Sequence, residues 1–101
     1  MTTLQREVRL EDEEIALFKN STYKKDSLSK LYLFGSRTKL DKRGGDIDLI
    51  ILSDTITRSD VRDIRIEFIK NFGEQKIDII LDTLTPQKTF TKVVIKKAIE
   101  L

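Results

Sequence analysis

Two apolar runs carry aspartates in the same alternating phase, and this pattern limits the possible folds more than any other feature. The runs are DIDLIIL (46–52) and KIDIILD (76–82), and both are rich in residues that favour strands. Because strand side chains alternate between faces, Asp46 and Asp48 share one face of the first run. Asp78 has the same phase in the second run. The pattern predicts two strands with one buried face and carboxylates on the other face.

The residues between the two runs have the spacing of an amphipathic helix over about 60–72. Ser59 is the expected N-cap, and Gly73 suits the C-terminal end. The apolar positions that recur on one face are Val61, Ile64, Phe68 and Phe72. A helix that joins two strands of one sheet predicts a right-handed crossover and therefore parallel strands.

The chain before these runs predicts one helix and one strand. Residues 11–20 favour a helix with acidic side chains in its first turn, and Ile15 and Phe18 would face the core. Residues 30–35 (KLYLFG) favour a strand that ends at a glycine. No helix separates this strand from residues 46–52, so we expect the two to pair antiparallel.

The two ends of the chain complete the predicted fold. Residues 1–9 show no clear pattern and are expected to form a frayed end or an edge strand. A last helix is expected to begin at Thr85–Pro86 and to carry one apolar stripe, Phe90, Val94, Ala98 and Leu101. The elements together predict one α+β (α/β) domain over residues 1–101, a small mixed sheet with helices on one face.

Composition limits the chemistry. The chain has 101 residues, which suits one domain, and it has no cysteine and no histidine. Disulfides, thiolate sites and imidazole sites are therefore excluded, and a metal would be held by carboxylates, which favour Mg²⁺. No apolar run approaches the about 20 residues of a membrane helix, and no secretory leader is evident, so we expect a cytoplasmic protein. The net charge of +2 is too small to indicate nucleic-acid binding.

The residues that follow the 30–35 strand are typical of a phosphate site. Gly35 allows close approach of the backbone, and Ser36 offers a hydroxyl to phosphate oxygens. Arg37 comes next and can pair with phosphate charge. The Gly44–Gly45 pair predicts the turn that directs Asp46 and Asp48 back toward this loop.

The three aspartates are the candidate metal ligands. Asp46, Asp48 and Asp78 are expected near the starts of neighbouring strands, where their mutual repulsion would raise at least one carboxyl pKa. One or two Mg²⁺ ions that carry substrate phosphates would relieve this repulsion. A lone Asp-x-Asp or Gly-Ser is weak evidence, because both are common on ordinary surfaces. The combination is specific, because aspartate is disfavoured inside apolar strands.

The pattern LFGSR, GGDIDLIIL and KIDIIL resembles the DNA polymerase β-like nucleotidyltransferase superfamily over about residues 11–100. It is most similar to stand-alone minimal nucleotidyltransferases (MNT) of bacteria and archaea, which are commonly antitoxins paired with a helical toxin of the HEPN type. The resemblance implies that Gly35 and Ser36 hold the triphosphate, with Arg37 as a further nucleotide contact. It implies that Asp46, Asp48 and Asp78 bind two Mg²⁺ ions, and that Asp78 helps to accept the proton of the attacking hydroxyl.

The function expected from this resemblance is transfer of AMP from Mg-ATP to a hydroxyl on a HEPN-type partner. A homodimer is also open, because so small a domain can hardly enclose an acceptor. A second hypothesis is a binding module that covers its partner without catalysis. A third is modification of nucleic-acid ends, which only the basic cluster Lys39, Lys42 and Arg43 favours. A small-molecule acceptor is formally possible as well.

Overall fold

The computed structural model describes residues 8–40 and 44–101, so most of the segment 1–9 lies outside the described residues. Its elements in chain order are α1 (Asp12–Lys25), β1 (Lys30–Phe34), a 3₁₀ turn (Gly35–Thr38), β2 (Ile47–Leu52), α2 (Arg58–Phe72), β3 (Ile77–Asp82), α3 (Thr89–Val94), a second 3₁₀ turn (Ile95–Lys97) and β4 (Ile99–Glu100).

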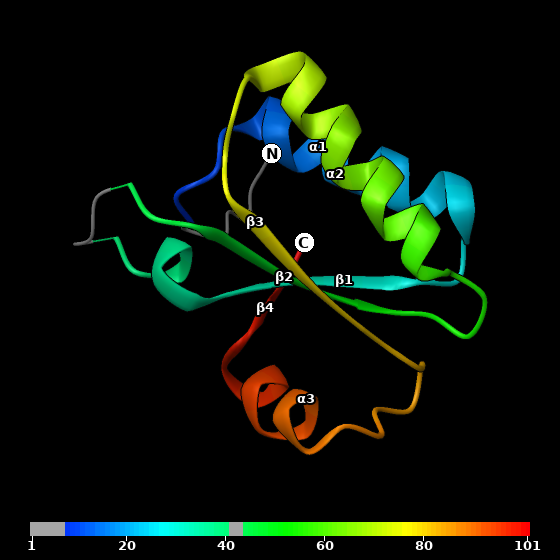
Figure 1. Ribbon diagram of the computed structural model, residues 1–101. Coiled ribbons are helices and arrows are strands. Elements are labelled where there is room, and N and C mark those ends of the chain that lie inside the picture. Colours follow the sequence, from blue (N-terminus) through cyan, green and yellow to red (C-terminus); the bar gives the residue numbers. More distant parts are fainter. Residues whose placement is uncertain (1–7, 41–43) are drawn as a thin grey trace, which may run out of the picture.

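The described strands form one mixed sheet in the order β3-β2-β1-β4. β2 and β3 are parallel, and β1 is antiparallel to both of its neighbours, which confirms the predicted directions. The helices α1 and α2 lie side by side over one face, as expected, whereas α3 lies on the opposite side (Figure 1). The α+β class and the mixed sheet are therefore confirmed, and α3 departs from the expected single helical face.

The main core lies between the sheet and the pair α1 and α2. Its centre is a stack of Phe18 from α1 on Phe68 from α2, with ring centroids 4.7 Å apart and planes 7° apart. Both rings are fully covered, as are the strand residues beneath them, Leu31, Leu33, Ile47, Leu49 and Ile51. The predicted core positions of both helices are confirmed, except that Phe72 is 41% exposed.

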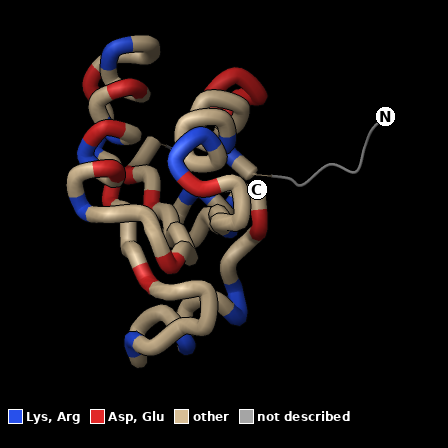
Figure 2. Tube along the Cα trace, turned by 90° about the vertical axis from the view of Figure 1, so that its right-hand side faces the viewer, with Lys and Arg blue, Asp and Glu red and all other residues tan. Residues whose placement is uncertain are grey.

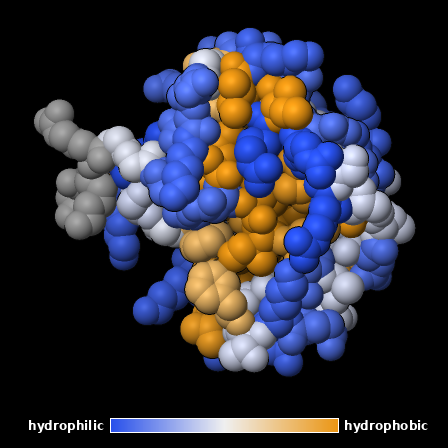
Figure 3. Space-filling view, viewed as in Figure 1, coloured by the Kyte–Doolittle hydropathy of each residue, from blue (hydrophilic) through white to orange (hydrophobic). Residues whose placement is uncertain are grey.

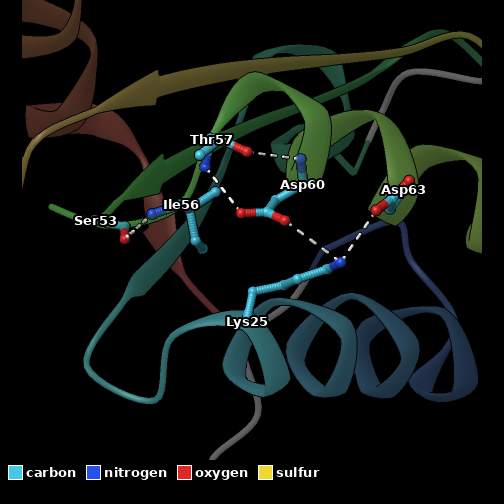
Figure 4. Close-up of polar contacts among 6 residues, drawn as sticks. All are labelled: Lys25, Ser53, Ile56, Thr57, Asp60 and Asp63. Atoms are coloured by element: carbon cyan, nitrogen blue, oxygen red, sulfur yellow. Dashed lines mark hydrogen bonds and ion pairs between the residues drawn. The ribbon is translucent and has the colours of Figure 1, made fainter.

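The start of α2 is fixed by a capping box two residues earlier than predicted (Figure 4). The Thr57 hydroxyl accepts from the Asp60 N–H, and the Asp60 carboxylate accepts from the Thr57 N–H. Ser59 lies inside the first turn, so its expected role as N-cap is wrong. Thr57 is preferred because the residue three positions later carries a carboxylate that completes the box. Lys25 at the end of α1 pairs with Asp60 and Asp63, which joins the two helices.

The end of the chain differs most from the prediction. Residues 85–88 form no helix, and α3 is one short piece, Thr89–Val94. The carboxylate of Asp82 accepts hydrogen bonds from the N–H groups of Gln87 and Lys88, which holds this segment in a turn. The expected helical stripe is then broken, because Ile99 pairs with Leu33 at the free edge of β1.

The surface carries both charge signs, and one face of it also shows apolar side chains. Figure 2 shows Lys and Arg interspersed with Asp and Glu along the trace. Figure 3 shows apolar side chains in the middle of the face where β3 runs in Figure 1, which fits the half-buried Ile79, Ile80 and Leu81 of this edge strand. Within the described residues, no helix has the length and apolar character required to cross a membrane.

Candidate functional site

Two of the three predicted carboxylates lie directly beside each other at the amino ends of β2 and β3. Asp48 is the register partner of Asp78 on one side and of Phe34 on the other. Side chains at directly opposed positions of neighbouring strands share a face. This face is opposite to α1 and α2, because Phe34 packs against Phe90 of α3 with ring centroids 6.1 Å apart. Asp46 comes one residue before β2, on the same side of the chain as Asp48.

The carboxylates repel each other as expected. Burial raises the pKa of Asp48, and the charges of Asp78 and Asp46 raise it further, while Lys76 opposes them. Lys76 Nζ lies 3.5 Å from Asp46 Oδ2. This ion pair is largely exposed, so a divalent cation can replace the ammonium at little cost.

The carboxylates of Asp46, Asp48 and Asp78 suit a hard cation, although the three side chains do not all point to one place. Among the described residues, no three acidic side chains gather closely enough to form a complete metal site. Asp48 and Asp78 supply an adjacent carboxylate pair, and Asp46 is held by Lys76. Oxygen donors of this kind fit Mg²⁺, which usually binds one or two carboxylates together with substrate phosphates.

Two glycines allow the chain to pass close to these groups. Gly35 has φ +80°, and a Cβ placed there would overlap Asp48 Oδ2 and lie 3.2 Å from Asp48 Cγ. Gly45 has φ +91°, and a Cβ there would lie 2.7 Å from the Ser36 hydroxyl oxygen. The Gly35–Ser36 turn therefore lies directly against Asp48, the neighbour of Asp78. A phosphate chain bound by this turn would reach cations held by Asp48 and Asp78.

A glycine turn for phosphates beside carboxylates for cations is the arrangement that nucleotidyl transfer needs. The family model described as Polymerase beta, Nucleotidyltransferase matches residues 17–101, a range that includes the positions of all six predicted site residues. The chain belongs to the polymerase beta nucleotidyltransferase family. No curated protein matches it. The chain is thus a nucleotidyltransferase, and its substrate is a nucleoside triphosphate.

In this nucleotidyltransferase, Arg37 is occupied by contacts within the protein. Its Nη1 donates to the carbonyl of Arg9 at 2.8 Å, and its Nη2 donates to the Gly45 carbonyl and to Gln75 Oε1, both at 3.2 Å. Gln75 in turn donates to the Gly45 carbonyl at 3.1 Å. These bonds favour a positioning role for Arg37, and its contact with nucleotide stays a prediction.

The residue that sequence reasoning missed is Arg9. Its guanidinium donates to three loop carbonyls, those of Ser36, Lys39 and Gly44, at 2.8–2.9 Å. No local signal indicates this, because the contacts span 27 to 35 residues of chain. Of the basic cluster next to the motif, Lys42 and Arg43 lie outside the described residues, whereas Lys39 is exposed.

Proposed function

We propose that this nucleotidyltransferase moves AMP from Mg-ATP to a hydroxyl group of a partner protein, and that the modification silences a helical HEPN-type toxin. The observation that supports the reaction is the contact of the Gly35 turn with Asp48, which in turn is paired with Asp78. This contact brings the turn that we assign to phosphate and the two carboxylates that we assign to the cation together on one face of the sheet.

Each site residue has a proposed role in this reaction. Gly35 and Ser36 hold the β- and γ-phosphates, while Asp46, Asp48 and Asp78 hold Mg²⁺. When bound, Mg²⁺ neutralises the phosphate charge that develops during transfer. The acceptor oxygen forms a bond to the α-phosphorus, the bond from that phosphorus to the β-phosphate oxygen breaks, and pyrophosphate leaves. The exposed Asp78 accepts the hydroxyl proton.

An acceptor on another molecule fits the exposure of the site. Asp78 is exposed, so an acceptor can reach it from solvent. On the same side of the sheet, α3 presents Phe90 and Val93, which are 56% and 62% exposed. Exposed apolar side chains of this kind are typical of contacts between proteins. We propose that they contact the partner, which can be a HEPN-type chain or a second copy, in the cytoplasm where ATP is supplied.

The acceptor class is tested by transfer of label from α-labelled ATP with Mg²⁺ in native-host extract. Wild type is expected to label one macromolecule, and Asp48→Asn is expected to label it about 10²–10³-fold more slowly. Protease-sensitive, nuclease-resistant label supports a protein acceptor. Nuclease-sensitive label would instead identify a nucleic-acid acceptor, and label on a small molecule would exclude both.

A further inference from the structure

Arg9 lies next to the phosphate turn without being part of it. Its Nη2 donates to the Ser36 carbonyl at 2.9 Å, its Nε to the Lys39 carbonyl at 2.8 Å and its Nη1 to the Gly44 carbonyl at 2.9 Å. One planar group therefore holds both ends of the loop that connects the turn to β2. Arginine alone offers donors in such a rigid fork, and lysine presents only a flexible point charge.

The direction of these carbonyls fixes the direction of the neighbouring amides. A trans peptide is planar, so its C=O and the N–H of the next residue point to opposite sides. The Ser36 carbonyl accepts from Arg9 Nη2 and also from the Lys39 N–H at 3.0 Å, so the Arg37 N–H points away from both donors. The Thr38 hydroxyl holds the Gly35 carbonyl at 2.7 Å and orients the Ser36 N–H in the same manner. Successive amides that point outward form a cavity that binds anions.

A second set of bonds locks this arrangement to the strand that carries Asp78. The Arg9 N–H donates to the Arg37 carbonyl at 2.8 Å, and Arg37 Nη1 donates back to the Arg9 carbonyl at 2.8 Å. Arg37 also reaches Gln75, which lies just before β3. The segment before α1, the phosphate turn and the start of β3 are therefore one hydrogen-bonded unit.

We propose that Arg9 is a positioning residue that, through the Ser36 carbonyl, holds the Arg37 amide of the Gly35–Thr38 turn toward the triphosphate and fixes the loop that follows the turn. This inference rests on the proposed function, because it assigns the turn to phosphate binding. Arg9 does not touch the nucleotide. It holds one carbonyl of the turn and two of the following loop, and thereby raises the affinity of the site for polyphosphate.

The test is binding of a fluorescent α,β-methylene analogue of ATP with Mg²⁺, with affinity and binding stoichiometry measured together. Arg9→Gln is expected to weaken binding about tenfold or more at a stoichiometry near one, because a disordered turn must be reordered by each ligand. Arg9→Lys keeps the charge but loses the fork, so its affinity should lie between those of Arg9→Gln and wild type. Arg62→Gln removes an exposed α2 charge and is the matched control, expected to bind like wild type.

The possible results distinguish failure of the role proposed for Arg9 from failure of the proposed nucleotidyl transfer. Arg9→Gln binding with wild-type affinity would overturn the inference, as would a reduced stoichiometry at unchanged affinity, which indicates only loss of folded protein. An equal loss in Arg62→Gln would show a general charge effect and would also overturn it. If wild type itself binds no nucleotide, the proposed function fails, and the hydrogen bonds of Arg9 then serve the fold of the loop alone.

Discussion

Asp48→Asn is expected to lower nucleotidyl transfer by about 10²–10³-fold, the size of effect seen when one electrostatic contact to a transition state is removed. Asp48 is the central carboxylate, with Asp78 beside it and Gly35 against it. Asparagine keeps the shape of the side chain and removes the charge that we propose holds a cation. The initial rate with saturating ATP and Mg²⁺ measures this effect.

The same change is expected to stabilise the metal-free protein at pH 7. Burial and the neighbouring charges of Asp78 and Asp46 raise the pKa of Asp48 above its ordinary value of 3.8. The folded state therefore holds the proton more tightly than the unfolded state, so ionisation of Asp48 destabilises the fold as the pH rises above about 3.8. Asparagine removes this cost, and the gain should shrink as the pH is lowered toward 4.

Thermal unfolding in a metal chelator at pH 7 and pH 4 measures the gain in stability. Asp12→Asn is the matched control, because Asp12 lies exposed in the first turn of α1 and is not one of the candidate site residues. This control is expected to retain activity and to gain no stability. A variant of Asp48 that loses both activity and stability would mean that Asp48 serves the fold and not the metal.

Gly35→Ala is expected to remove nearly all activity and to destabilise the fold. The left-handed backbone at φ +80° costs about 1–2 kcal/mol for a residue with a Cβ. The new methyl group would also overlap the Asp48 carboxylate, which must move aside. Displacement of a catalytic group by about 1 Å can cost about 10²-fold in rate. Urea unfolding and the rate of transfer measure the two effects separately.

Gly73→Ala is the control that separates backbone strain from overlap. Gly73 ends α2 with φ +92°, and a Cβ there would meet nothing within 4 Å. Its positive φ also imposes a conformational cost on alanine, and Gly73→Ala is expected to retain activity. Equal activity losses in the two variants would show that strain alone, and not contact with Asp48, explains the effect.

The placement of the candidate site residues was largely predictable because its signals are local. The alternation in residues 46–52 and 76–82 places Asp48 and Asp78 on one face, and their pairing follows from the parallel crossover. The turn at Gly35 was predictable as well, because a glycine directly after an apolar strand indicates a turn from neighbouring residues alone.

The parts that could not be predicted depend on contacts between distant segments. The bonds of Arg9 to the loop have no local pattern. The last segment has helical spacing, yet its final residues pair with the free edge of β1, and Asp82 holds the preceding turn. Thr57 displaced Ser59 as the cap because Asp60 completes a box only with Thr57.

The most direct test of the central claim compares ATP labelled at the α-phosphate with ATP labelled at the γ-phosphate, using wild type with Mg²⁺ and native-host extract. We predict that label moves to the acceptor from the α-phosphate only, with one pyrophosphate released per transfer. Asp48→Asn should release pyrophosphate about 10²–10³-fold more slowly. Transfer from the γ-phosphate would mean a phosphotransferase and would contradict the assigned chemistry. Transfer by Asp48→Asn at the wild-type rate would contradict the proposed role of Asp46, Asp48 and Asp78 as ligands of Mg²⁺.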